Sequence, residues 1–249
     1  MYRYEDLVGR NFPVINGDAQ EKIRNLGVAF FGAGAVSFSA EYLARMGVET
    51  FVLVDGDRIG PENVNHQDYG CGDVGKNKAE ALKERLTEIN PGARVTALPV
   101  FLTEENLEEI WRLLSGIHIL VDGIDPIPDI TLSRMLAEKC AEKGILYLYP
   151  LDLGNGAVVF TNPKEFLKTE GESPLEILMN LIQGLPIPMK LKGVFEDVIG
   201  GKLSYYPQTI IAAVSTSFLV TSSILEWIKG RTLPSVIYLD PTENIFYVK

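Results

Sequence analysis

Short apolar runs alternate with amphipathic stretches along most of the chain, and each pattern predicts one kind of element. Apolar runs bounded by glycine, proline or acidic residues are typical of buried strands, and apolar residues three or four apart are typical of helices. We predict strands at 27–34 (with its closing glycines), 49–55, 94–101, 118–125, 145–152 and 156–162, and helices at 18–25, 36–47, 75–90, 103–115 and 130–143. This alternation predicts an α/β fold with a Rossmann-like, doubly wound, mostly parallel central sheet flanked by helices.

The pattern changes after residue 162. Residues 163–207 are rich in proline and read as loop, which is typical of a lid or binding loop. A long apolar helix and two short strands follow, at 209–228, 235–240 and 244–249, and predict a mixed or antiparallel C-terminal extension. We expect a single domain over 1–249, made of a helical arm (1–26), a core (27–162), a Pro-rich crossover or lid (163–207) and the long helix with the terminal strands (208–249).

Residues 209–228 are uncharged up to Glu226 and are long enough to cross a membrane. Many of these positions are serine or threonine, which weakens insertion, and no basic cluster precedes the segment. We interpret it as a buried or interface helix, with a membrane span as the alternative, and expect no membrane partner.

Composition narrows the range of partners. The chain of 249 residues has a formal net charge of -10, which argues against nucleic acid as its main partner. Its two cysteines, Cys71 and Cys140, form no CxxC pair, so neither a disulfide framework nor a cysteine zinc site is expected. The first residues lack an apolar signal region, and we expect a cytoplasmic protein.

The first candidate for chemistry is the glycine turn GAGAVS at 32–37, which follows a predicted strand and precedes a predicted helix. Such a turn lets the backbone approach a phosphate at the helix N-terminus. Asp55, at the end of the next strand, is placed to accept hydrogen bonds from ribose hydroxyls. On these features alone, NAD and ATP are equally suitable ligands.

The polar stretch that follows favours ATP. Asn63, Asn65 and Gln67 supply uncharged hydrogen-bonding groups, and Lys76 and Lys78 stand where the next helix is predicted to open. Cations are unfavourable at a helix N-terminus unless an anionic ligand compensates for them. We therefore predict a triphosphate-facing edge here.

Seven motifs in order give a specific resemblance. They are Arg10-Asn11, GAGAVS at 32–37, Asp55-Gly56-Asp57, NVNHQ at 63–67, GKNK at 75–78, INP at 89–91 and DGID at 122–125. With these motifs the chain resembles the E1-like superfamily of ubiquitin-activating-type adenylyltransferases, which includes the ThiF, MoeB and HesA families. The strong match covers residues 10–125, and PQT at 207–209 before the long helix is also similar.

The resemblance implies an ATP-dependent adenylyltransferase in which 27–162 is the nucleotide-binding core. It activates a carboxylate, or a similar oxygen nucleophile, of a small molecule, a peptide or a ubiquitin-like carrier C-terminus. It also implies Mg²⁺, held near Asp125, and a homodimer in which Arg10 reaches ATP, in its own or the partner subunit. The implied catalytic residues are Arg10, Lys78 and Asp125, and the implied ATP-binding residues are Gly32, Ala33, Gly34, Ala35, Asp55, Asp57, Asn63, His66, Gln67 and Lys78.

The sequence departs from this family in three places. His66 stands where the family has the arginine of N-x-x-R-Q, the paired CxxC motifs are missing, and no cysteine occurs in 141–249, where many relatives have one that takes up the acyl group. We expect adenylation without a zinc site and without a covalent thioester step. Cys71 is a minor candidate acceptor, and Cys140 is expected in the core.

Three other functions remain open. His66 and Ser37 suit an ATP-binding scaffold or sensor without catalysis, and the glycine turn with Asp55 suits a NAD-dependent oxidoreductase. A dehydratase that acts on threonylcarbamoyladenosine in tRNA belongs to the same superfamily.

Overall fold

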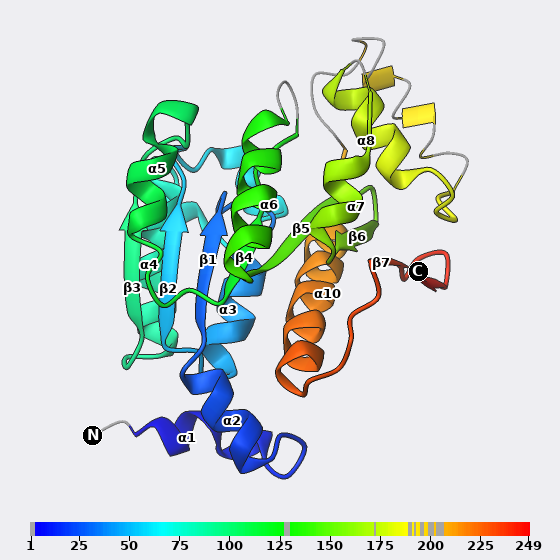
Figure 1. Ribbon diagram of the computed structural model, residues 1–249. Coiled ribbons are helices and arrows are strands. Elements are labelled where there is room, and N and C mark those ends of the chain that lie inside the picture. The colour runs from blue at the N-terminus through cyan, green and yellow to red at the C-terminus, as the bar shows by residue number, and fades with distance from the viewer. Residues whose placement is uncertain are drawn as a thin grey trace.

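The computed structural model describes residues 3–126, 130–171, 173–188, 191, 193–194, 197–198, 202 and 207–249, without the side chains of 164–166 and 174–175. A single eight-stranded sheet runs through these residues in the order β3-β2-β1-β4-β5-β6-β7-β8 (Figure 1). The strands are β1 (Gly27–Phe31), β2 (Thr50–Val54), β3 (Arg94–Leu98), β4 (Ile119–Asp122), β5 (Leu146–Leu153), β6 (Gly156–Phe160), β7 (Val236–Asp240) and β8 (Ile245–Val248).

The sheet is parallel on one side and antiparallel on the other. β3, β2, β1 and β4 pair in parallel, and β5 pairs in parallel with β4 over its first residues. From Tyr149 onward β5 pairs antiparallel with β6, and β7 and β8 continue the antiparallel part. The strand order reverses between β1 and β4, and ligands of open α/β sheets bind at such a switch point. The predicted fold class is confirmed.

Helices cover both faces of the sheet. They are α1 (Tyr4–Val8), α2 (Gly17–Arg24), α3 (Ser37–Arg45), α4 (Lys78–Ile89), α5 (Glu104–Arg112), α6 (Thr131–Lys143), α7 (Pro163–Lys168), α8 (Pro174–Ile182) and α10 (Ile210–Ile228), with short 3₁₀ turns η1 (Gly9–Asn11), η2 (Pro61–Asn65) and η3 (Cys71–Asp73). Figure 1 shows α1 and α2 beyond the amino ends of the parallel strands, and α8 beyond their carboxyl ends.

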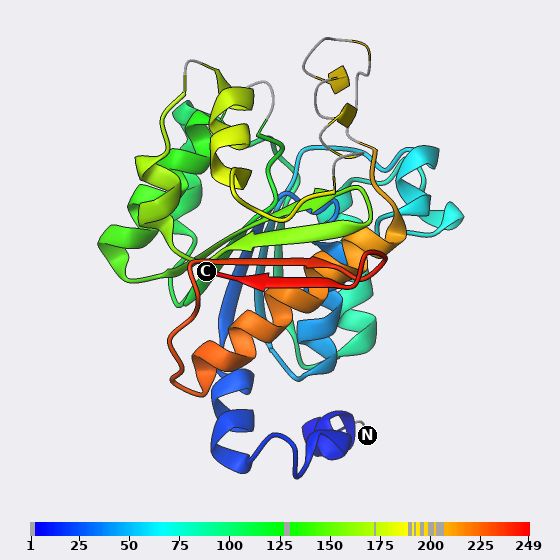
Figure 2. The same ribbon diagram turned by 90° about the vertical axis from the view of Figure 1, so that its right-hand side faces the viewer.

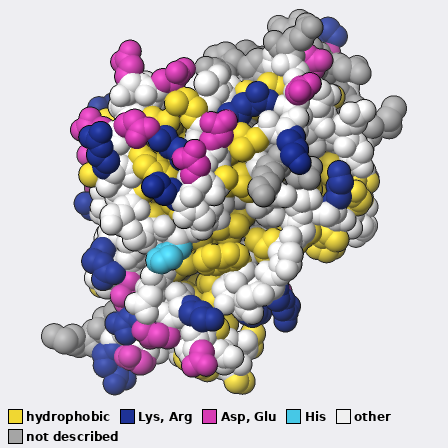
Figure 3. Space-filling view, in the orientation of Figure 1, with side chains coloured by type: hydrophobic (Ala, Val, Ile, Leu, Met, Phe, Trp, Pro, Cys, Tyr) yellow, Lys and Arg dark blue, Asp and Glu magenta, His cyan; other side chains and the backbone are white. Residues whose placement is uncertain are grey.

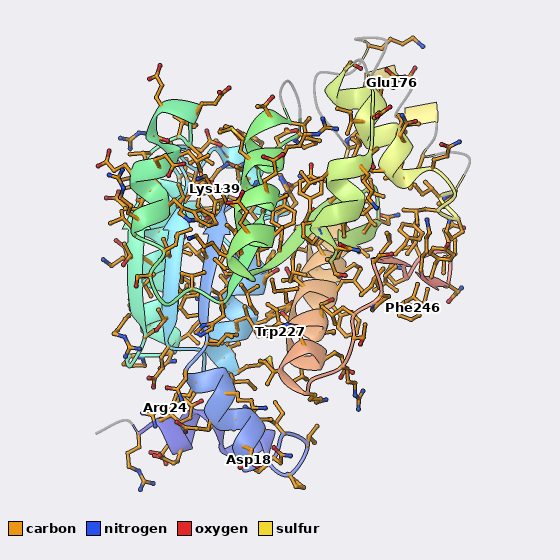
Figure 4. The ribbon with its side chains drawn as sticks, viewed as in Figure 1. Asp18, Arg24, Lys139, Glu176, Trp227 and Phe246 are labelled. Atoms are coloured by element: carbon orange, nitrogen blue, oxygen red, sulfur yellow. The ribbon has the colours of Figure 1, made fainter. Side chains whose placement is uncertain are left out.

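The sheet separates two apolar cores. Phe30 enters the core beneath α3, α4 and α10, and its neighbour Phe31 enters the core beneath α5, α6 and α8. Side chains alternate across a strand, so a central strand buried on both faces is apolar at every position. This is why GVAFF is a continuous apolar run. Lys139 of α6 reaches across to α5, where it pairs with Glu108 and lies over the Trp111 ring (Figure 4).

Among the described residues, α10 is long and apolar enough to span a membrane, judged by length and composition only. Half of its apolar window is buried inside the protein, where it packs against α3, β5 and β6 (Figure 2). Ser39 of α3 and Ser217 of α10 hydrogen-bond at 3.1 Å in this interface. The packing supports the interpretation of 209–228 as a buried helix.

Two expectations about helices need correction. The segment 163–207 is not simply a loop, because it contains α7 and α8. Ser173 caps α8 by accepting a hydrogen bond from the Glu176 N–H at 3.2 Å, and the apolar residues of α8 enter the core. The helix expected over 75–90 begins at Lys78, because Asn77 caps it by accepting from the Glu80 N–H at 3.1 Å. Lys76 precedes the helix and pairs with Asp73 and Glu84 at the surface.

Charged side chains of both signs cover the outer helices. On the face shown in Figure 3, Lys and Arg side chains stand among Asp and Glu side chains over α5 and α6, and again over α1 and α2. Opposite charges in close alternation give a weak net field on this face.

Candidate functional site

A cavity of about 1300 Å³ opens beyond the carboxyl ends of the parallel strands. It lies where the strand order reverses, at the place expected for a ligand in this fold. Most of the predicted site residues line it, namely Gly32, Gly34, Ala35, Asp55, Asp57, Asn63, His66, Gln67, Lys78 and Asp125.

The glycine turn after β1 is held tightly against the next strands. Gly32 has a positive φ of 83°, and a β-carbon there would lie 2.5 Å from the carbonyl oxygen of Gly123. Only glycine fits such a position without moving the backbone. The next residue, Ala33, does not line the cavity, but its N–H donates to Asp55 Oδ2 at 2.6 Å. The turn and the end of β2 are therefore locked together.

Asp55 occupies the end of β2 with both carboxylate oxygens engaged. Besides Ala33, the Asp57 N–H donates to Oδ1 at 2.8 Å. Burial raises the pKa of Asp55, and these two backbone donors oppose the rise. Each carboxylate oxygen can accept more than one hydrogen bond, so Asp55 keeps capacity for a hydroxyl group of a ligand.

Lys78 places a cation in the cavity wall. It is the first residue of α4 and is 8% exposed, and its Nζ lies 3.0 Å from Asp57 Oδ2. Buried ammonium groups need a partner, and Asp57 supplies it in the absence of a ligand. A phosphate in the cavity would gain the interaction with this cation.

The NVNHQ loop provides fewer ligand groups than we expected. Asn63 uses its Oδ1 to accept from the Gly60 N–H at 2.8 Å, so this oxygen shapes the 3₁₀ turn η2. Gln67 lies against the glycine turn, since a β-carbon on Gly34 would come within 3.2 Å of its Nε2. Gln67 Oε1 is buried and has no hydrogen-bond partner among the described residues.

His66 lies between two amides. Its Nδ1 contacts Asn65 Oδ1, and its Nε2 lies 3.3 Å from Gln67 Nε2. A neutral ring protonated at Nδ1 satisfies both contacts, because it donates to Asn65 and accepts from Gln67. Burial lowers the pKa of His66, and the nearby charge of Lys78 lowers it further. The imidazole is therefore neutral near pH 7, unlike an arginine in the same place.

The two acids of the DGID motif have different surroundings. Asp125 lines the cavity. Asp122 is fully buried and accepts hydrogen bonds from Tyr147 Oη at 2.7 Å and the Ile124 N–H at 3.0 Å. Burial raises the pKa of Asp122 to about 6. Asp122 thus supports the loop that presents Asp125.

The described residues contain no group of three or more His, Cys, Asp or Glu side chains that would hold a metal ion by themselves. This arrangement suits Mg²⁺, which commonly binds through one or two carboxylates, with water and ligand phosphates completing its shell. Asp57 and Asp125 are two of the carboxylates in the cavity wall, which also contains Asp55, Glu62, Asp152 and Asp240.

Arg10 is not brought to the cavity of its own chain. It is exposed in η1, beside α1 and α2, at the end of the molecule opposite the glycine turn (Figure 1). Cys71 is exposed and lies outside the cavity lining, and Cys140 is buried in α6, where burial raises its pKa. The expectation that Cys140 belongs to the core is confirmed.

The sequence analysis missed Asp152. It lies in the second half of β5 and lines the cavity beside Thr216 of α10, whose hydroxyl donates to Asp152 Oδ1. Nearby, Thr209 Oγ1 donates to Asn155 Oδ1 at 2.9 Å. The available signal was an acid inside the apolar run ILYLYPLD, which we had interpreted only as a strand.

Comparison with known sequences identifies relatives with related activities. Residues 8–166 match the model of the ThiF family. The tRNA threonylcarbamoyladenosine dehydratase of Bacillus subtilis is 36% identical over 63% of this chain and 59% of its own length. The sulfur carrier protein ThiS adenylyltransferase of the same organism is 34% identical over 60% of this chain and 44% of its own length. The chain thus matches about half the length of these curated relatives.

Solved structures share the fold over nearly the whole chain. The tRNA threonylcarbamoyladenosine dehydratase of Escherichia coli, in complex with ATP, superposes with a TM-score of 0.68 at 21% identity, covering 91% of this chain and 95% of that one. Escherichia coli MccB with MccA gives a TM-score of 0.70 at 19% identity, covering 100% and 72%. Identities this low concern the fold alone. The family match over more than half of the sequence, together with the glycine turn, Asp55 and Lys78 around one cavity, shows that this chain belongs to the ThiF family.

Proposed function

We propose that the protein is an ATP-dependent adenylyltransferase, which activates a carboxylate as an acyl-adenylate and releases pyrophosphate. The observation that carries the proposal is that the glycine turn, Asp55 and Lys78 line one cavity together with apolar residues such as Leu151 and Leu153. The names of the curated relatives, which include carrier-protein adenylyltransferases, support it. The chemistry uses neither a zinc site nor a cysteine of this chain.

Each residue then has a physical role. The N–H groups of Gly34 and Ala35, which line the cavity just before α3, receive phosphate oxygens, because the N-terminus of a helix has a positive potential. Asp55 accepts hydrogen bonds from ribose hydroxyls. Lys78 exchanges part of its interaction with Asp57 for the triphosphate. Gln67 Oε1, which has no hydrogen-bond partner among the described residues, is available to accept from a donor group of the ligand.

The reaction needs positioning and charge neutralisation more than a base. An ionised carboxylate oxygen attacks the α-phosphorus, the bond from this phosphorus to the bridging oxygen of the β-phosphate breaks, and pyrophosphate leaves with the bonding pair. No proton moves, since the nucleophile is already a carboxylate. Lys78 reduces the repulsion between carboxylate and triphosphate and stabilises the charge on the leaving group.

Magnesium is part of the proposal. Asp125, with Asp57 nearby, would hold the ion, which supplies charge neutralisation on the phosphates. The modest number of carboxylates suits an ion that enters together with the nucleotide.

A homodimer is also part of the proposal. Ile210, Ile211, Val214 and Phe218 form an exposed apolar strip along α10 and line a second cavity of about 440 Å³ with almost no polar surface. A second copy of the chain would cover this strip, and its Arg10 is available to a neighbouring subunit. Light scattering tests this: we expect twice the chain mass for the wild type and a lower mass for Phe218→Asp.

ATP–pyrophosphate exchange tests the activity. We expect exchange that depends on ATP, magnesium and an added carboxylic acid, measured over a panel of amino acids, short peptides and carrier-protein C-termini. Tight ATP binding with no exchange under any acid would indicate a scaffold or sensor instead. Calorimetry that finds NAD bound in preference to ATP would indicate an oxidoreductase.

The second candidate is a dehydratase of threonylcarbamoyladenosine in tRNA, and it is favoured by the names of relatives from Bacillus subtilis and Escherichia coli. Incubation with tRNA that carries this nucleoside, followed by mass spectrometry of the digested nucleosides, separates the two. An ATP-dependent loss of one water from this nucleoside would select the dehydratase.

A further inference from the structure

One part of the cavity wall contains an acidic side chain that the nucleotide does not need. Asp152 lies in the second half of β5, flanked in the lining by Pro150, Leu151 and Leu153. The register pairs Val121 of β4 with Leu148, so β5 continues past the end of β4. At about 3.3 Å per residue, Asp152 stands about 10 Å beyond the level at which β4 ends. Asp152 thus lines the cavity from the extension of β5, away from the ends of β1 and β2 that carry the glycine turn and Asp55.

One carboxylate oxygen of Asp152 has a hydrogen-bond partner among the described residues, and the other has none. Thr216 donates its hydroxyl proton to Oδ1, while Oδ2 is buried and has no hydrogen-bond partner among the described residues. Asp240, the other acid in this part of the lining, differs. Its Oδ1 accepts from the backbone N–H groups of Thr242 and Glu243, so it serves the turn after β7. Asp152 has no comparable structural duty.

The charge on Asp152 also lacks a counterion. None of the salt bridges among the described residues includes it, and no charged neighbour offsets the effect of its burial, which raises its pKa to about 6. Near pH 7 the carboxylate is mostly ionised, and no described residue compensates its charge. A largely desolvated carboxylate without a counterion is costly, and a cationic ligand removes that cost.

We propose that Asp152, positioned by Thr216, is a specificity-determining residue that binds the protonated amine of the substrate whose carboxylate is activated. The inference rests on the proposed adenylyltransferase function. It narrows the substrate class to acids that carry an amine, such as an amino acid or a short peptide with an apolar side chain. Such an acid is then a better substrate than a carrier-protein C-terminus. The substrate would place its carboxylate toward Lys78 and its ammonium group at Asp152, with apolar atoms against Pro150 and Leu153.

The test compares matched acids in ATP–pyrophosphate exchange. The probes are the standard amino acids and the dipeptides glycyl-leucine and leucyl-glycine, each with its N-acetylated form and with the same acid lacking the amine. We expect the wild type to favour the free-amine probes. In Asp152→Asn the KM for the preferred amine probe rises at least tenfold while kcat stays within about twofold, the size of a lost charge-assisted hydrogen bond.

Two further variants separate recognition from structure. Thr216→Val removes the hydroxyl that orients Asp152 and should raise the KM for the amine probe in the same direction but less. Glu226→Gln makes the same carboxylate-to-amide change at the surface end of α10, where Glu226 pairs with Lys229 and Arg231, and should leave exchange unchanged.

Three results would overturn the inference. If the wild type uses acetylated or amine-free acids as well as free-amine acids, the role of Asp152 is contradicted while the proposed function stays intact. If Asp152→Asn loses activity equally with all probes, the role is also contradicted, because that outcome indicates a structural role. If no acid supports exchange, the proposed function itself fails and the inference fails with it.

Discussion

The Nζ of Lys78 lies 3.0 Å from Asp57 Oδ2, so the cation of the candidate site is bound to a carboxylate before any ligand arrives. Lys78 is buried while the Asp57 side chain is half exposed, which leaves the carboxylate the easier of the two to move. A triphosphate can therefore take over the ammonium group while Asp57 turns toward a metal ion. The pair thus satisfies the buried ammonium group of Lys78 until an anionic ligand replaces the carboxylate.

Replacement of Lys78 should weaken ATP binding, whereas replacement of Lys76, the other lysine of the GKNK motif, should not. Lys78→Ala removes a buried cation, and we expect the Kd for ATP to rise about ten- to 100-fold, the range for a charge-assisted hydrogen bond. Lys76→Ala is the matched control, because Lys76 lies outside the cavity lining and pairs with Asp73 and Glu84 at the surface. Calorimetry with ATP measures both. Equal losses in the two variants would contradict the assignment.

The glycine turn should not tolerate a side chain. Gly32→Ala must place a β-carbon at positive φ and 2.5 Å from the Gly123 carbonyl oxygen, so we expect a loss of about 3 kcal/mol or more in the free energy of unfolding. Gly72→Ala is the control, since a β-carbon there meets nothing within 4 Å. Urea denaturation compares the two. A Gly32→Ala protein as stable as the Gly72→Ala protein would show that the turn is not constrained as described.

His66 should make ATP binding depend on pH. The pKa of His66 is lowered, so the ring stays neutral at a pH where an ordinary histidine would already be protonated. It gains a proton only in more acidic solution. We expect the affinity for ATP in the wild type to increase only as the pH falls below 6.5, the ordinary pKa of histidine. His66→Arg should bind ATP several-fold more tightly at pH 7.5 without this dependence, and His66→Gln should lack both effects. Lost exchange activity in His66→Arg, despite intact ATP binding, would mean that the histidine has its own role.

The charge on Asp152 should lower the free energy of unfolding in neutral solution. Its folded pKa of about 6 lies above the ordinary value of 3.8, so the folded state binds this proton more tightly than the unfolded state. The penalty is absent below the unfolded pKa, grows as pH rises and is complete above the folded pKa. We expect Asp152→Asn to raise the free energy of unfolding by about 3 kcal/mol at pH 8 and by roughly half as much at pH 5.

Glu226→Gln is the control of opposite sign for that measurement. Its cationic neighbours Lys229 and Arg231 lower the pKa of Glu226, so its charge is favourable in the folded state at neutral pH. The substitution should leave stability unchanged or slightly reduced at pH 8. An Asp152→Asn variant whose stability gain does not change between pH 5 and pH 8 would show that the gain does not come from the charge.

The parallel half of the fold could be predicted because its strands are buried on both faces. GVAFF and the other apolar runs then stand out against amphipathic helices, and Gly32 and Asp55 follow at fixed places. The order of motifs carried the prediction for Lys78 and Gln67. The helices α7 and α8 were missed because their prolines suggested loop, although Pro163 and Pro174 each stand at the first position of a helix, where proline is favourable.

Asp152 could not be found from local sequence. Its importance comes from Thr216, which is 64 residues away along the chain, and from a cavity whose walls come from several distant elements. Asn63 lines the cavity, but one of its polar atoms is already bonded. Residue type and motif suggested a ligand-facing amide, whereas its oxygen holds the Gly60 N–H of its own turn. Sequence pattern identifies which residues gather at the ends of strands, but not which of their atoms are already bonded.

The change of partner along β5 has a practical consequence for redesign. The first part of β5, Leu146 to Leu148, pairs with β4 in the parallel half of the sheet, which carries the candidate nucleotide-binding residues. The second part, Tyr149 to Leu153, pairs with β6 in a hairpin that turns at Gly154 and Asn155. The hairpin is a natural unit for exchange between relatives, since its ends are fixed by the sheet and its tip borders the cavity. Grafting it should transfer preference for one acid over another while leaving the phosphate-handling half untouched.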